Sequence, residues 1–210
     1  MNTLDGLAAV CEAASLPFED AWLPELRKLA ALLAAGQART NLVGDASEAG
    51  LLTHVREALT VAALTLDVRG GAPKQAVDVG AGAGLEALTL AIVWPDARVV
   101  AIEPRTLRAS FIAETAAALG LQNLHVIAKS LHSADTGGRF QLASARAVWP
   151  FPEWPERARG LLAPGGVAAV HAFGPASTLG ERLVAPGWQL RGARDVPGEK
   201  PYAVAILARG

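Results

Sequence analysis

The chain has 210 residues, of which 51% are hydrophobic and 19% are charged, so it can bury the core of a globular domain and is not a disordered polymer. Its formal net charge of -1 at pH 7 excludes a global basic field of the kind that attracts nucleic acid, although a local basic patch could still bind RNA. Cys11 is the only cysteine, which excludes an intrachain disulfide and a CxxC metal site and indicates a reducing compartment.

The N-terminal segment has no basic start and carries Asp5 and Glu12, which argues against a secretory signal. No run of about 18 uncharged apolar residues occurs, so we expect no membrane-spanning segment. These features together predict a soluble cytoplasmic protein.

The first 70 residues have the pattern of amphipathic helices. Large apolar residues recur at helical spacing in 22–35 and again in 47–66. Ser47 is placed to cap the second helix. A polar, turn-rich link covers 37–46, and the glycines and proline of 68–73 separate this helical part from the rest.

From residue 75 onward, short apolar runs alternate with helical stretches. We expect strands at 75–80, 97–103, 124–128, 140–147 and 167–173, helices at 84–94, 106–119 and near 155–162, and a closing antiparallel pair at 187–196 and 201–208. Gly120 should end the helix before it, and a Pro-Gly-Gly turn should precede the fifth strand. Strand–helix alternation of this kind predicts an α/β fold with a doubly wound parallel sheet covered on both faces.

The stretch AVDVGAGAGLE (76–86) places a glycine-rich loop between a strand and a helix. The spacing is Asp78-x-Gly80-x-Gly82-x-Gly84, which is neither the G-x-G-x-x-G of dinucleotide enzymes nor a P-loop. Such a loop lets a ligand approach the backbone closely and is typical of nucleotide sites. A packing turn is the simpler alternative.

Glu103 closes the next expected strand. A carboxylate at that point can accept hydrogen bonds from a ribose diol. Taken alone, Glu103 could be a surface residue and Asp78 a turn acid. Together with the glycines they favour a nucleoside site.

An acid before G-x-G-x-G, with a second acid closing the next strand, resembles the S-adenosylmethionine-dependent methyltransferases. More narrowly, the chain resembles the bacterial small-subunit ribosomal RNA guanine-N7 methyltransferase family, also called glucose-inhibited division protein B. The matching segments, in order, are Asn41-Leu42-Val43, His54-Val55-Arg56-Glu57-Ala58, AVDVGAGAGL, Leu90–Pro95, Leu119–Asn123, Ala145-Arg146-Ala147 and Pro164-Gly165-Gly166.

This resemblance implies a seven-stranded, Rossmann-like methyltransferase domain at 71–210 with an N-terminal helical extension at 1–70. It implies S-adenosylmethionine as cofactor and a guanine N7 of 16S ribosomal RNA as target, in the RNA or the small ribosomal subunit. We also expect a monomer. No metal is expected, because His125, His132 and His171 do not have the spacing of a set of metal ligands.

The resemblance also implies roles for individual residues. The expected cofactor-binding residues are Asp78, Gly80, Ala81, Gly82, Gly84, Leu85, Glu103, Pro104, Ser130, Leu131 and Arg146. Arg146 is the expected catalytic residue, and His54, Arg108 and Trp149 are the expected substrate-binding residues.

Simpler roles remain open for several of these residues. Arg146 could form an ion pair with Asp78 or Glu103, and His54 could be a satisfied core histidine. The aromatic run with Trp149, Phe151 and Trp154 could stack on a base or pack as a rigid loop on the sheet.

At four places the sequence departs from the family pattern, and these departures bear on which substrate the protein binds. Glu86-Ala87 replaces Pro-Gly, Leu107-Arg108 replaces a Lys-Arg pair, Ser130-Leu131-His132 replaces Arg-x-Glu, and either His171-Ala172 or Phe173-Gly174 replaces Lys-Gly. Because RNA binding depends on Lys and Arg, a paralogue that methylates another RNA or a small molecule, or that only binds, stays an alternative. Glu86 could be a plain helix-start residue, or it could point inward and weaken cofactor binding.

Overall fold

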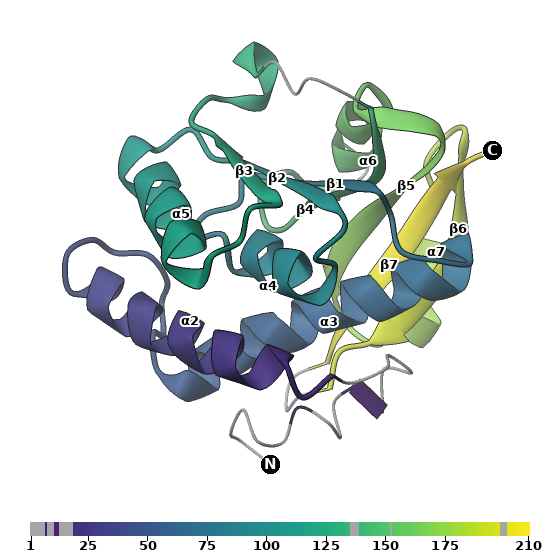
Figure 1. The fold of residues 1–210 in the computed structure, drawn as a ribbon. Helices are drawn as coiled ribbons and strands as arrows, with labels where there is room; N and C mark the ends of the chain where they lie inside the picture. Colours follow the sequence, from purple (N-terminus) through teal and green to yellow (C-terminus); the bar gives the residue numbers. More distant parts are fainter. Residues whose placement is uncertain (1–6, 8–10, 13–18, 135–138, 152, 198–200) are drawn as a thin grey trace.

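A seven-stranded sheet forms the centre of the molecule (Figure 1), with the strand order β3-β2-β1-β4-β5-β7-β6. The computed structural model describes residues 7, 11–12, 19–134, 139–151, 153–197 and 201–210. The strands are β1 (Gln75–Val79), β2 (Arg98–Ile102), β3 (Leu124–Ile127), β4 (Phe140–Ala145), β5 (Leu162–Phe173), β6 (Trp188–Asp195) and β7 (Tyr202–Arg209). Strand β7 runs antiparallel to β5 and β6, and the other pairings are parallel. The predicted doubly wound sheet with an antiparallel closing pair is therefore confirmed.

Helices cover both faces of the sheet. They are α2 (Trp22–Gln37), α3 (Glu48–Arg69), α4 (Leu85–Val93), α5 (Thr106–Leu119), α6 (Glu153–Arg159) and α7 (Leu179–Arg182), with short 3-10 turns at Leu131–Ser133 and Ala176–Thr178. Alternate residues of one strand face opposite layers. In β2, Val99 and Ala101 pack in the core under α2 to α5, whereas Val100 and Ile102 pack in the core with α6 and α7.

The two long N-terminal helices belong to the same core as the sheet. Leu26, Leu29 and Leu33 of α2 are fully buried together with strand and α4 side chains. Helix α3 packs against α4 and continues along β6 and β7 (Figure 1). The division of the chain at residue 70 stays a prediction, since the apolar core runs across it.

Local sequence signals set several element ends as predicted. The hydroxyl of Ser47 accepts a hydrogen bond from Gly50 N at 3.2 Å and caps α3. Gly120 ends α5 with a left-handed φ of 72°. Helix α5 has the predicted bounds, and most other ends lie within a few residues of the expected ones.

The segment before the fifth strand differs from the prediction. Helix α6 ends at Arg159 and not near 162, and β5 already begins at Leu162. The register jumps from Phe140↔Leu162 to Leu142↔Val167, so Pro164-Gly165-Gly166 forms a bulge within the paired strand and not a turn ahead of it. The fourth strand ends at Ala145, because Ala147 takes a left-handed φ of 55° that turns the chain away.

The sheet order places a topological switch point between β1 and β4, because the chain runs outward from β1 in both directions. Ligands of doubly wound sheets bind outside the carboxyl ends of the strands at that point. None of the described helices is long and apolar enough to cross a membrane. The expectation about a secretory signal concerns N-terminal residues that lie largely outside the described ranges.

Candidate functional site

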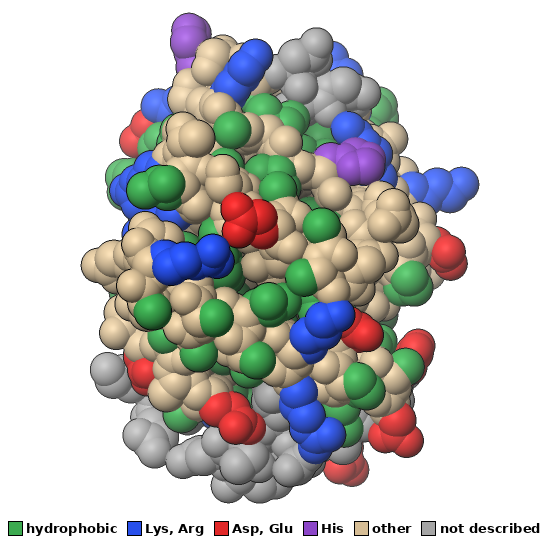
Figure 2. Space-filling view, turned by 60° about the vertical axis from the view of Figure 1, so that its left-hand side comes forward, with side chains coloured by type: hydrophobic (Ala, Val, Ile, Leu, Met, Phe, Trp, Pro, Cys, Tyr) green, Lys and Arg blue, Asp and Glu red, His purple; other side chains and the backbone are tan. Residues whose placement is uncertain are grey.

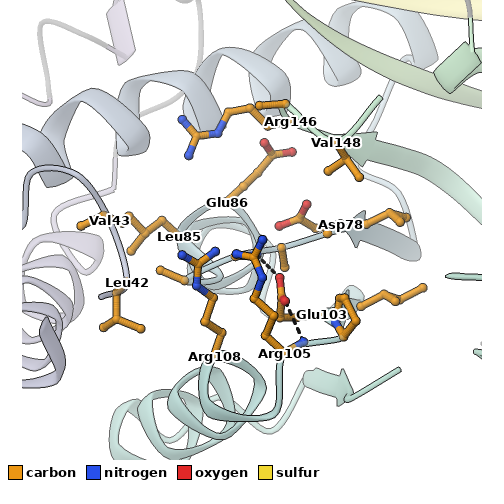
Figure 3. Close-up of a pocket in the computed structure, with 18 of the residues that line it drawn as sticks. Leu42, Val43, Asp78, Leu85, Glu86, Glu103, Arg105, Arg108, Arg146 and Val148 are labelled. Carbon is orange, nitrogen blue, oxygen red and sulfur yellow. Dashed lines mark hydrogen bonds between the residues drawn. The ribbon is translucent and has the colours of Figure 1, made fainter. Parts of the chain in front are cut away.

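A pocket of about 560 Å³ opens at the switch point, between the carboxyl ends of β1, β2 and β4 and the segment that precedes α3 (Figure 3). Its volume is within the range of about 300–1,000 Å³ that is usual for small-molecule sites. Of the residues predicted to bind cofactor or substrate, those that line it are Asp78, Gly80, Ala81, Gly82, Leu85, Glu103, Pro104, Ser130, Leu131, Arg146, His54, Arg108 and Trp149.

The glycine loop brings backbone to the floor of this pocket. Gly80, Gly82 and Gly84 have φ values of 69°, 61° and 75°, in the left-handed region that glycine adopts without strain. Gly80 N and Ala81 N donate to Ile102 O at 2.7 and 3.0 Å, which ties the loop to the end of β2. A Cβ on Gly80 would lie 2.5 Å from Val148 Cγ2, so any larger residue would have to displace that side chain as well as adopt a left-handed φ.

Gly84 is the one predicted cofactor-binding residue that does not line the pocket. It is the N-cap of α4, and a Cβ there would lie 2.6 Å from Ile112 Cγ1 of α5. Its role in this structure is therefore close packing of α4 on α5 and not ligand contact.

Glu103 is 3% exposed and lies beside the loop. Its Oε2 accepts from Gly82 N at 2.8 Å and its Oε1 accepts from Arg105 N at 2.9 Å. A carboxylate oxygen can accept a second hydrogen bond, so Glu103 is still able to receive ligand hydroxyls.

Glu86 points into the molecule. It is 8% exposed, and its carboxylate lies between Arg146 and Asp78 (Figure 3). His171 Nε2, on β5, lies 3.0 Å from Glu86 Oε2. The simple helix-start interpretation of Glu86 is therefore wrong.

Asp78 and Glu86 carry a perturbed pair of carboxyls. Burial, and next the charge of Glu86, raise the pKa of Asp78 well above its usual range. Burial also acts to raise the pKa of Glu86, but His171, a hydrogen bond from Ser144 and the charge of Arg146 together hold it below its usual value. The shared negative charge is therefore concentrated on Glu86.

Arg146 is held from α3. Its Nη1 donates to Glu57 Oε2 at 2.8 Å, and the same Nη1 lies 2.8 Å from His54 Nδ1. Neither expected partner of an ion pair, Asp78 or Glu103, is the one found. His54 is part of this cluster at the pocket wall and not a histidine of the apolar core.

Glu57 and His171 were missed as site residues. The His-x-x-acid spacing of His54 and Glu57 places both on one helical face and could have indicated Glu57. His171 appeared in the sequence only as one candidate for the Lys-Gly position of the family, and its contact with Glu86 depends on the strand order, which places β5 two strands from β1.

A second pocket of about 530 Å³ shares Arg146 and Ala147 with the first. Its wall includes Asp45 and Arg56 from the α3 side and His171, Phe173 and Tyr202 from β5 and β7. Phe173 is 76% exposed and packs edge-on against Tyr202, with ring centroids 5.3 Å apart. An open aromatic surface thus adjoins the cofactor-sized pocket.

The aromatic run after β4 packs mainly on the sheet. Trp154 is buried and donates through Nε1 to Ala169 O at 2.7 Å. Trp149 stacks on Trp154 with ring centroids 5.8 Å apart, and the guanidinium carbon of Arg157 lies over the Trp149 ring, 4.9 Å from its centroid. Of the three aromatic residues, only Trp149 lines the pocket.

Two arginines stand at the mouth. Arg105 and Arg108 extend from the start of α5 toward the centre of the pocket (Figure 3), and Arg108 Nη2 donates to Asn41 O at 3.2 Å. Among the described residues, no three His, Cys, Asp or Glu side chains gather as a metal site would require.

The family model for GidB, rRNA small subunit methyltransferase G, matches residues 23–171. The chain belongs to the GidB family. It is 35% identical over 139 residues to the ribosomal RNA small subunit methyltransferase G of Frankia alni, an alignment covering 64% of this chain and 50% of the relative. It is 36% identical over 151 residues to the protein of the same name in Deinococcus radiodurans, covering 68% of this chain and 57% of the relative.

The fold has solved counterparts as well. The ribosomal protein L11 methylase of Lactobacillus delbrueckii subsp. bulgaricus superposes with a TM-score of 0.56 at 18% identity, covering 73% of this chain and 78% of the other. At that identity the likeness concerns the fold alone. The GidB chain described here spans only about half the length of the two relatives above, so their activity comes to it as a proposal.

Proposed function

We propose that this chain is an S-adenosylmethionine-dependent methyltransferase that modifies N7 of a guanine in 16S ribosomal RNA. The observation that carries the proposal is the pocket at the switch point, in which a left-handed glycine loop and the buried Glu103 meet within a chain of the GidB family. S-adenosylmethionine would supply an electrophilic methyl group on its sulfonium.

The residues present fit this cofactor. Gly80 and Gly82 line the pocket with left-handed backbone, and a Cβ on Gly82 would meet only Arg108 Nη1, at 3.9 Å, so a ligand can approach the loop there. The carboxylate of Glu103 lines the same pocket at the end of the second strand, as an acceptor for a ribose diol would. Ser130, Leu131 and Pro104 provide the wall for the adenine. The loop with Asp78 and Leu85 surrounds the remaining, methionine-bearing end.

Guanine N7 has a free lone pair, so its methylation requires no removal of a proton. The protein can act by holding N7 in line with the methyl group at about 3–3.5 Å and by excluding water. Arg146, fixed by Glu57 and positioned where the two pockets meet, is suited to donate to the O6 edge of the base. We assign base contacts to His54 and Trp149 as well, which line the first pocket together with Arg146.

Ribosomal RNA is the proposed partner. On the face in Figure 2, Lys and Arg side chains are interspersed with Asp and Glu side chains and form no continuous basic field. Arg105 and Arg108 supply positive charge at the pocket mouth. This charge partly compensates for the family's Lys and Arg residues that are missing from this sequence.

The second candidate function is a paralogue that binds the cofactor but methylates another RNA or a small molecule, or does not methylate at all. The specific observation in its favour is Leu107, which replaces the lysine of the family pair and is 70% exposed beside the pocket mouth.

Transfer of labelled methyl groups from S-adenosylmethionine to small ribosomal subunits that lack the modification tests the proposal, with the methylated base mapped. Label at the N7 of one guanine is the expected result. Cofactor binding without label in subunits or naked 16S RNA would favour the second candidate, and failure to bind the cofactor would contradict both.

A further inference from the structure

Glu86 presents a buried anion with an unused acceptor. Its Oε2 accepts from His171 Nε2, since a carboxylate can only accept and the ring nitrogen must donate, and Ser144 gives the carboxylate a further hydrogen bond. Its Oε1 is buried and has no hydrogen-bond partner among the described residues. Leaving a buried charged acceptor unmet is costly, so this oxygen is a position where a ligand donor would be strongly favoured.

The place of Glu86 restricts what that donor can be. It stands on the first turn of α4, directly after the glycine loop, and lines the cofactor pocket. Asp78 is its acidic neighbour, so a second anion is disfavoured there. The side chain of His171 is 1% exposed and is not among the residues that line the cofactor pocket.

Of the polar groups at the methionine end of S-adenosylmethionine, only the α-ammonium can donate hydrogen bonds. The carboxylate is an acceptor, the sulfonium carries no donor hydrogen, and the ribose hydroxyls are matched to Glu103. We propose that Glu86 receives the α-ammonium of the cofactor, with His171 as the residue that holds the carboxylate in place. This inference rests on the proposed function. Here Glu86 strengthens cofactor binding, the reverse of the sequence-based concern that an inward glutamate would weaken it.

Calorimetry with two thioether ligands that share the thioadenosine group and lack the sulfonium charge tests the assignment. S-adenosylhomocysteine carries the amino-acid end, whereas 5′-methylthioadenosine lacks it. Loss of a charge-assisted hydrogen bond in Glu86→Gln should weaken S-adenosylhomocysteine binding about 10- to 100-fold and leave 5′-methylthioadenosine binding unchanged. Glu114→Gln, which alters an exposed carboxylate on α5, is the matched control and should change neither.

Equal weakening of both ligands in Glu86→Gln would make Glu86 a merely structural residue, and an unchanged affinity for S-adenosylhomocysteine would also overturn the proposal. If the wild-type chain binds neither ligand, the proposed function itself fails. A further measurement needs no variant: S-adenosylhomocysteine with its amino group replaced by hydrogen should bind the wild-type chain about 10- to 100-fold more weakly than the parent. Equal affinity of the two would refute the ammonium contact.

Discussion

Asp78 and Glu86 bring two carboxyls together in the buried wall of the pocket, and His171, Arg146 and Glu103 also act on their pKa values. A carboxyl whose pKa is raised in the folded state favours folding below its unfolded pKa and loses that contribution as the pH rises through the folded value. Asp78 should therefore lower the stability of the ligand-free protein near neutral pH. Attraction between the acidic pair and the cationic cofactor would offset this loss when the cofactor binds.

Asp78→Asn should raise the free energy of unfolding relative to wild type, and the difference should grow as the pH rises above the ordinary carboxyl pKa of 3.8 toward the raised pKa of Asp78. Asparagine keeps an oxygen for the Ala87 backbone N–H but has no charge to bury. Urea unfolding at several pH values measures this. A difference that does not vary with pH would show that Asp78 is not held in its neutral form.

Glu86 and His171 should depend on each other for stability. Removal of either partner leaves the other buried without its counterpart, at a cost of about 3–5 kcal/mol. The loss of unfolding free energy in the double variant Glu86→Ala/His171→Ala should therefore be smaller, by at least about 1 kcal/mol, than the summed losses of the two single variants. The exposed pair Asp67–Arg194 is the control and should couple by about 0–1 kcal/mol. Additive losses at 86 and 171 would contradict the buried pair.

At the scale of elements, the loop between β1 and α4 is constrained by space as well as by φ. Gly80→Ala places a methyl group 2.5 Å from Val148. Gly70 also has a left-handed φ, of 74°, but a methyl group added there would have no atom within 4 Å. Gly70→Ala should cost about 1 kcal/mol for the left-handed backbone. Gly80→Ala should cost about 1–3 kcal/mol more through overpacking and should weaken S-adenosylhomocysteine binding. Equal losses of stability in the two variants would show that the Val148 side chain moves aside at no cost, and would contradict this prediction.

Elements set by local periodicity were predictable, and those set by distant pairing were not. The apolar spacing of α5 and its terminal Gly120 gave correct bounds, because both signals lie within the helix. Pro-Gly-Gly at 164–166 predicts a turn from its residue types alone. The structure has a bulge there, because residues on both sides of it pair with β4 and keep the segment in the sheet. At the site, Glu103 and the loop followed from spacing, whereas the Glu86–His171 contact joins α4 to β5 and depends on the strand order.

At the scale of the whole molecule, two pockets of similar size meet at Arg146. One contains the glycine loop and the acids, and the other contains the exposed aromatic surface of Phe173 and Tyr202. Glu57 of helix α3 holds Arg146, which lines both pockets, so this N-terminal helix is a structural part of the site. A cofactor in the first pocket and a base in the second would meet beside Arg146.

The most direct test of the claim that the first pocket is the cofactor site is calorimetric titration of wild type and Glu103→Ala with S-adenosylhomocysteine. Glu103 is buried, anchors the loop through Gly82 N and faces the pocket, so its removal takes away both a ligand acceptor and the tether of the loop. We expect wild type to bind and Glu103→Ala to bind at least about 10-fold more weakly. Wild-type affinity in Glu103→Ala would place the cofactor elsewhere and contradict the site.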